Sequence, residues 1–227
     1  MKKKERGIKL VRYLVVWLIL WILSWVGFLY IRDFGIGYVN GFWISALYFF
    51  IASAIIIFFF KKDFHPLVKN FEYLPIFILL CSIILSFLIY DTTNIYFQKP
   101  IDVIGNYDFT EFIGLESSYL VPKLMNILFQ QTLMVLLVSF FIKLKIPTKE
   151  MIVSIVLVFS IAHAWLFVTE GFFPGVFYFT ASIAAAITFP LLIRKVNYGF
   201  VYSYTIHYLF YVLSGFILRI AFMSVKI

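Results

Sequence analysis

The sequence predicts an all-α integral membrane protein, a polytopic bundle of about seven transmembrane helices with a cytoplasmic N-terminus. The chain is 63% hydrophobic and only 13% charged, whereas soluble domains average about 25% charged residues. Its apolar residues fall into seven long runs, and its basic residues cluster between alternate runs. A soluble fold of 227 residues has no interior large enough for so much apolar surface, so lipid must be its main solvent.

The seven apolar runs define the predicted helices. Each is long enough, or nearly long enough, to cross a hydrocarbon layer of about 30 Å, which takes roughly 20 helical residues. They cover residues 10–31, 42–60, 73–90, 120–142, 151–168, 171–193 and 198–223. The third and fifth runs are short, which allows one of them a smaller tilt or a partly re-entrant path. The first run exceeds the apolar core of a signal peptide, so we expect an uncleaved anchor.

Charged residues between the runs predict the orientation, because cytoplasmic loops are enriched in Lys and Arg. Basic residues gather in the N-terminal tail and in the second, fourth and sixth loops: Lys2, Lys3, Lys4, Arg6, Lys9, Lys61, Lys62, Lys69, Lys143, Lys145, Lys149, Arg194 and Lys195. The intervening loops collect acidic residues instead. The N-terminus is therefore predicted inside and the C-terminus outside.

Charge distribution and cysteine count limit the classes of partner that the chain can bind. The net charge of +8 comes from short loop clusters and not from one basic face, which argues against nucleic-acid binding. The single cysteine, Cys81, lies in an apolar run, so one chain has neither a disulfide framework nor a thiolate metal site. The lipid bilayer is the partner that the composition predicts.

A polar segment divides the chain. Residues 91–119 are acidic and aromatic, with Pro100 and Gly105 as helix breakers. We expect an extracytoplasmic loop here; a cap or a segment along the membrane surface is the alternative. The predicted organisation is a three-helix membrane region with this loop over residues 1–117 and a four-helix core over residues 118–227.

Several polar side chains are predicted to lie inside the membrane, where they are costly and mark functional positions. They are Asn126, Gln130, Gln131, His163 and His207. At 1.5 Å per helical residue, Gln130, Gln131, His163 and His207 fall within about one turn of the same depth. The last helix also has a polar-aromatic stripe at helical spacing: Tyr204, His207, Tyr208 and Tyr211. The alternative is that these groups only cross-link helices by hydrogen bonds.

The histidines do not predict a metal centre. Two histidines without a Cys, Asp or Glu at the same depth provide one ligand too few for zinc. We therefore expect neither a metal ion nor another cofactor.

Two short motifs give this pattern a family resemblance. Phe159 and His163 form F-x-x-x-H, and His207 begins H-x-x-x-Y, which ends at Tyr211. In this order they resemble the CAAX protease and bacteriocin-processing family (CPBP, or Abi), whose members carry E-E-x-x-x-R, F-x-x-x-H and H-x-x-x-N on successive core helices. The resemblance covers roughly residues 118–220 and implies an intramembrane endopeptidase of glutamic type in the plasma membrane of a prokaryote.

The chain departs from the family pattern at chemically decisive positions. Gln130 and Gln131 stand where the family has paired glutamates, Val135 where it has arginine, and Tyr211 where it has asparagine. In the family a glutamate is the general base for a water molecule that the histidines hold. A neutral amide has no useful basicity near pH 7, and loss of a general base costs roughly 10²–10⁴-fold in rate. Glu116 and Glu170 lie too near the membrane surface to replace it.

Three functional interpretations follow. The first is a CPBP-like protein that has lost catalysis and keeps the cavity, lined by the candidate catalytic positions Gln130, Gln131, His163 and His207, for a peptide, a lipid or a partner helix. Its candidate binding residues are Asn126, Phe159, Tyr204 and Tyr211. The second is an active variant of the protease, acting on transmembrane or lipidated peptides. The third is a transporter or a subunit of a membrane complex, unrelated to proteases.

Overall fold

A computed structural model of the chain describes residues 3–64, 72–97, 116–169 and 171–223, which form helices and no strand. The helices are α1 (Lys3–Arg32), α2 (Phe42–Phe64), α3 (Tyr73–Tyr96), α6 (Ser117–Lys143), α7 (Thr148–Ala164), α8 (Leu166–Thr169), α9 (Phe172–Lys195) and α10 (Gly199–Met223). Seven spans within them are long and apolar enough to cross a membrane. The fifth span, Thr148–Val168, includes α7 and most of the four-residue α8. The predicted membrane helix bundle is therefore confirmed.

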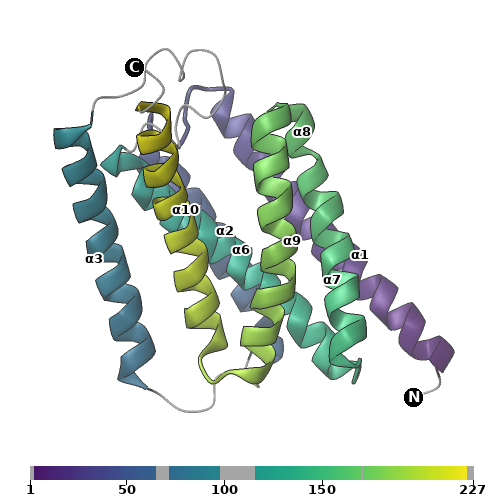
Figure 1. Ribbon diagram of the computed structural model, residues 1–227. Helices are drawn as coiled ribbons and strands as arrows, with labels where there is room; N and C mark the ends of the chain where they lie inside the picture. The colour runs from purple at the N-terminus through teal and green to yellow at the C-terminus, as the bar shows by residue number, and fades with distance from the viewer. Residues whose placement is uncertain (1–2, 65–71, 98–115, 170, 224–227) are drawn as a thin grey trace.

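The helix α6 is the central element of the bundle. It contacts α1, α2, α3, α9 and α10, and Figure 1 shows it passing behind α9 and α10. Within its membrane window 83% of the residues are buried, against 17–39% in the other six spans. Helix α1 begins and α10 ends at opposite ends of the bundle (Figure 1). We call the end at which α1 ends the outer end, in accordance with the charge pattern.

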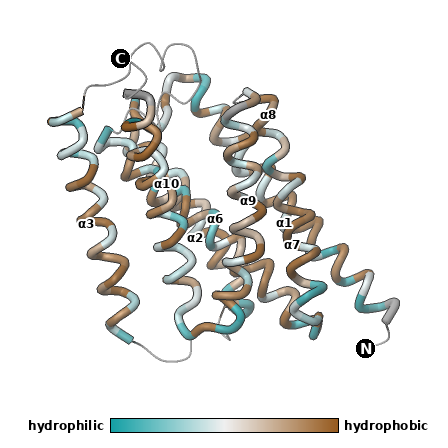
Figure 2. Tube along the Cα trace, in the orientation of Figure 1, coloured by the Kyte–Doolittle hydropathy of each residue, from teal (hydrophilic) through white to brown (hydrophobic). Residues whose placement is uncertain are grey.

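The outward surface of the bundle is apolar. Figure 2 shows hydrophobic residues along the bodies of the helices and many hydrophilic ones near their ends. Large apolar side chains point outward on every side, among them Leu23 on α1, Phe59 on α2 and Leu85 on α3. In water such a surface would cause association, but it is the surface expected where hydrocarbon is the solvent.

Two buried clusters hold the helices together. The larger one joins α6 to α1, α2, α7 and α9, and in it the indole N–H of Trp17 donates to the Leu133 carbonyl at 2.9 Å. The smaller one joins α3, α6 and α10 around Tyr90, Ile127 and Tyr208. Because lipid is as apolar as these side chains, close packing and interhelical hydrogen bonds hold such a bundle together.

Small residues allow α2 to pack closely against α6. Ser45, Ala46 and Ser53 are buried on α2. The Ser53 hydroxyl donates to the Phe49 carbonyl of its own helix at 2.8 Å, so it needs no partner on α6. Small side chains of this kind let two helix backbones approach in a membrane.

The third helix is longer than predicted. The apolar run ends at residue 90, but α3 continues to Tyr96, so the expected loop over 91–119 begins with helical residues. Arg219 on α10 explains the extension, because its Nη1 donates to Asn94 Oδ1 at 3.0 Å and its Nη2 to the Phe97 carbonyl. The prediction for residues 98–115 lies outside the described residues.

The fifth predicted helix is interrupted. It begins at Thr148 and ends at Ala164, and Trp165 forms a turn before the short helix α8. Gly171 then has a φ of +86°, in the left-handed region that glycine adopts without strain, and α9 starts after it. Glu170 lies outside the described residues.

Candidate functional site

A cavity of about 940 Å³ lies among α1, α6, α7, α9 and α10. Its wall is mostly apolar and aromatic. The polar side chains along it are Arg32, Lys123, Gln130, Gln131, His163, Ser182, Thr188 and His207, with the tyrosines Tyr38, Tyr119, Tyr178 and Tyr211. The described residues that line it include no aspartate and no glutamate. A concave apolar site of this size with a few convergent polar groups is typical of a small-molecule site.

The four candidate catalytic positions meet at this cavity. Gln130 and Gln131 come from α6, His163 from the last turn of α7 and His207 from α10, and all four line it. Gln130 and Gln131 are adjacent on one helix, so their side chains leave it in directions about 100° apart. Both nevertheless line the cavity.

Gln131 links α6 to α10 through both ends of its amide. Its Oε1 accepts a hydrogen bond from the Ser203 hydroxyl at 2.9 Å, and that hydroxyl shares its one proton with the Phe200 carbonyl of α10, also at 2.9 Å. Its Nε2 lies 3.1 Å from Nδ1 of His207. An amide nitrogen only donates, so Nδ1 of His207 is the acceptor of this hydrogen bond. Gln131 is thus a fixed structural group as well as a wall residue.

These contacts define different roles for the two imidazoles. His207 accepts at Nδ1, so in its neutral form the proton is on Nε2, which is a donor. His163 is the reverse, because its Nδ1 lies 2.9 Å from the Phe159 carbonyl, which only accepts. Neutral His163 is therefore protonated at Nδ1 and has an acceptor at Nε2. The cavity wall combines one imidazole donor with one imidazole acceptor.

Gln130 forms a separate pair with the residue one turn before it. Its Nε2 donates to Asn126 Oδ1 at 2.8 Å, which directs its own Oε1 to act as an acceptor at the cavity wall. Asn126 is fully buried and does not line the cavity. Its Nδ2 has no hydrogen-bond partner among the described residues. Asn126, predicted as a binding residue, therefore lies behind the site and orients Gln130.

Aromatic rings position His163. The Phe159 ring stacks on the imidazole with 5.7 Å between centroids, and the Trp21 ring of α1 lies 5.6 Å from it. Both aromatic residues also line the cavity. Phe159 is thus located where a binding residue was predicted, and Trp21 is a wall residue that the sequence did not single out.

The two predicted tyrosines have different surroundings. Tyr211 lines the cavity, with its ring 5.4 Å from that of His207. Tyr204 is not among the residues that line it. Its hydroxyl donates instead to the Leu124 carbonyl of α6 at 2.9 Å, so this side chain joins α10 to α6.

Lys123 is the principal site residue that sequence reasoning missed. It lies on α6 near the outer end of the cavity and is only 7% exposed. Its Nζ is 3.6 Å from the ring centroid of Tyr211, 5.4 Å from that of Tyr38 and 5.9 Å from that of Tyr119. Its position inside the fourth apolar run was a usable indication, since an ionisable residue in a span suggests a site.

Arg219 is a second buried cation that the sequence analysis missed. It lies within the last apolar run and is 1% exposed. Its partners Asn94 and Phe97 belong to the outer end of α3, and it does not line the cavity. Its role is to fasten α10 to α3.

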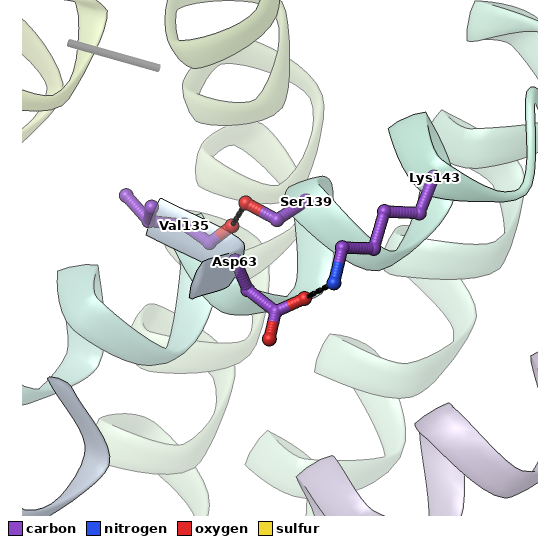
Figure 3. Close-up of polar contacts among 4 residues, drawn as sticks. All are labelled: Asp63, Val135, Ser139 and Lys143. Carbon is purple, nitrogen blue, oxygen red and sulfur yellow. Dashed lines mark hydrogen bonds and ion pairs between the residues drawn. The ribbon is translucent and has the colours of Figure 1, made fainter. Parts of the chain in front are cut away.

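Val135, which occupies the arginine position of the family motif, does not reach the cavity. It is buried in the larger core cluster. Figure 3 shows it on α6, where its carbonyl accepts from the Ser139 hydroxyl at 2.8 Å. One turn further on, the ammonium of Lys143 contacts the carboxylate of Asp63, which ties the inner ends of α6 and α2 (Figure 3).

The potential metal ligands among the described residues do not form a metal centre. Within the described ranges, no group of three or more His, Cys, Asp or Glu side chains is close enough to hold an ion. Comparison with protein-family models, curated proteins and solved structures finds no match, so the resemblance to the CPBP family depends on the sequence motifs alone.

Proposed function

We propose that the chain is a CPBP-like membrane protein that binds a ligand in the cavity and does not cleave peptide bonds. The ligand is a peptide, a lipid or a helix of a membrane partner. The observation that carries this proposal is the composition of the wall. It has hydrogen-bonding groups at the depth where the family performs chemistry, but its described residues include no carboxylate.

The hydrogen-bond pattern supports binding over hydrolysis. Gln131 is held by Ser203 and His207, and an amide at this position can orient a water molecule or a carbonyl but cannot take its proton. His207 offers a donor, and Gln130 and His163 offer acceptors. Such a set suits a ligand hydroxyl, carbonyl or amide group in an otherwise apolar chamber.

A variant hydrolase is the second candidate, and one observation favours it. Nε2 of neutral His163 is an acceptor on the wall of the cavity, because Nδ1 is committed to the Phe159 carbonyl. An imidazole is the commonest general base in enzymes. His163 is therefore the group that would activate water if this chain were an enzyme.

Reconstitution tests the two candidates against each other. The purified protein is incorporated into liposomes with a panel of transmembrane and prenylated peptides, and cleavage and retention of each peptide are measured. His163→Ala removes the candidate base, Gln130→Glu introduces a carboxylate at the family position, and Ser139→Ala is a matched control on the core side of α6. We expect retention of at least one peptide or of co-purified lipid, and no cleavage by the unmodified chain.

The outcome that contradicts the proposal is specific. Cleavage by the unmodified chain that disappears in His163→Ala and persists in Ser139→Ala identifies a variant protease. Cleavage by Gln130→Glu alone supports the proposal, because it restores the missing base to a cavity that still binds the family's kind of substrate.

A further inference from the structure

The cavity opens sideways toward the hydrocarbon layer of the membrane. Four residues that line it are also exposed on the outside of the bundle: Ile22 and Val26 on α1, Ile161 on α7 and Trp165 directly after α7, which are 48%, 58%, 70% and 58% exposed. They border an opening between α1 and the end of α7. Val26 lies six residues before the end of α1, about 9 Å along the helix, so the opening is within the outer half of the bilayer.

His163 presents a hydrogen-bond acceptor at this opening. It lies between Ile161 and Trp165 in the chain, and its Nδ1 donates to the Phe159 carbonyl at 2.9 Å, so Nε2 of the neutral ring is the acceptor. The described residues give Nε2 no hydrogen-bond partner. The rings of Phe159 and Trp21, with centroids 5.7 and 5.6 Å away, hold the imidazole in place. A polar atom without a partner in apolar surroundings is costly, so a ligand that donates to Nε2 gains affinity.

We propose that this opening admits a membrane lipid with an uncharged hydrogen-bond donor, a hydroxyl or an amide N–H. Its hydrocarbon chain occupies the cavity, and its donor group bonds to Nε2 of His163. This inference rests on the proposed binding function and names the class of the ligand.

The size of the cavity favours a hydrocarbon chain over a helix of a partner protein. A helix with its side chains is about 10 Å across and rises about 1.5 Å per residue, so each residue takes about 120 Å³. The cavity of about 940 Å³ therefore has room for about eight helical residues, whereas a membrane span needs roughly 20. A single flexible chain is far thinner than a helix and can pass through a side opening.

Small residues on α7 and α9 provide the room for this chain. Ala162 on α7 and Ala181, Ala184 and Ala185 on α9 line the cavity, together with large apolar side chains such as Phe189. Ala181 and Ala185 are about one turn apart, so they lie on the same face of α9. A larger side chain at Ala185 would therefore take the space of the ligand chain.

Tryptophan fluorescence provides the assay. Three of the five tryptophans, Trp21, Trp25 and Trp165, line the cavity. Trp43 is 66% exposed on α2 and would report contact with bulk lipid, so Trp43→Phe is the background for every measurement. The protein in uncharged detergent micelles, at a mildly alkaline pH, is titrated with dibromostearyl alcohol and with its methyl ether. The two probes have the same chain, but only the alcohol can donate a hydrogen bond.

We expect saturable quenching by both probes, with the alcohol binding about fivefold more tightly than the ether, which is the effect of one hydrogen bond between neutral groups. His163→Phe keeps an aromatic ring at this position but removes the acceptor. It should abolish the preference for the alcohol and leave the affinity for the ether unchanged, which also shows that the cavity is intact. Ser154→Ala is the matched control on α7 and should keep the full preference. Its hydroxyl also bonds the carbonyl four residues before it, at 2.9 Å, but it does not line the cavity.

A second pair of variants tests where the chain lies. Ala185→Phe fills part of the cavity and should abolish saturable quenching by both probes. Ala54→Phe makes the same substitution at an exposed position of α2 that does not line the cavity, and it should leave both affinities unchanged.

The outcomes separate this inference from the proposed function. Equal affinities for the two probes, or a preference for the alcohol that survives in His163→Phe, overturn the hydrogen bond to His163. Saturable quenching that Ala185→Phe does not change overturns the cavity as the place of the chain. No saturable quenching by either probe, while a peptide of the reconstitution panel is retained, overturns the lipid and leaves the proposed binding function. Absence of both quenching and retention overturns the proposed function as well.

Discussion

The link that Gln131 forms between α6 and α10 leads to a quantitative prediction. Gln131→Met keeps the size of the side chain, so it removes hydrogen bonds without creating a large void. Two interhelical contacts are lost, to Ser203 at 2.9 Å and to His207 at 3.1 Å. Interhelical hydrogen bonds in membranes contribute about 0.6–1.7 kcal/mol each, so we expect the free energy of unfolding to fall by about 1–3 kcal/mol.

The assay is reversible unfolding in mixed micelles, followed by circular dichroism as the fraction of denaturing detergent rises. A double-mutant cycle of Gln131→Met with Ser203→Ala isolates one contact, and its coupling should be about 0.6–1.7 kcal/mol. Ser139→Ala is the control, because that hydroxyl is also buried on α6 but bonds the Val135 carbonyl of its own helix (Figure 3). A coupling indistinguishable from zero, or equal costs for Gln131→Met and Ser139→Ala, would refute the interhelical network.

Three further predictions concern contacts between helices and the orientation of the chain in the membrane. Trp17→Phe should lower the free energy of unfolding by about 1 kcal/mol, because it removes the indole N–H that donates to α6, and the same unfolding assay measures it; an unchanged stability would contradict the contact. Lys143→Gln should change the free energy of unfolding by less than about 1 kcal/mol, because the ion pair with Asp63 is partly exposed. A larger decrease in the free energy of unfolding would show that the two charges are more strongly coupled. Reporter fusions at Lys69 and Asp108, both outside the described residues, should lie on opposite sides of the membrane, and reporters on the same side would overturn the orientation.

The sequence predicted the helices well because a helix that crosses the hydrocarbon layer of a membrane requires a long run of apolar residues. All seven predicted runs coincide with helices of the structure. The error at the end of α3 arose because residues 91–94 are polar and hydropathy ends the span at residue 90. The helix continues there because Arg219 of α10 provides a partner for Asn94, and a contact between residues so far apart cannot be read from local composition.

The site was only partly accessible to sequence reasoning. A shared depth and a motif order were enough to select Gln130, Gln131, His163 and His207, which the structure brings to one cavity. Depth cannot tell which face of a helix lines a cavity, so Asn126 and Tyr204 were grouped with the wall although neither lines it. Lys123 was missed because its surroundings include Tyr38 from the segment before α2 and Tyr211 from α10, which only the fold brings to it.

The burial of α6 has a consequence for biosynthesis. Two of its groups have partners on α10: Ser203 and His207 hold Gln131, and the Tyr204 hydroxyl donates to the Leu124 carbonyl. A ribosome makes α6 well before α10, so for an interval these groups face lipid or the insertion machinery without their final partners. We therefore expect nascent chains that stop before α10 to remain associated with membrane chaperones or to be degraded, because α10 provides the partners of Gln131 and part of the cavity wall.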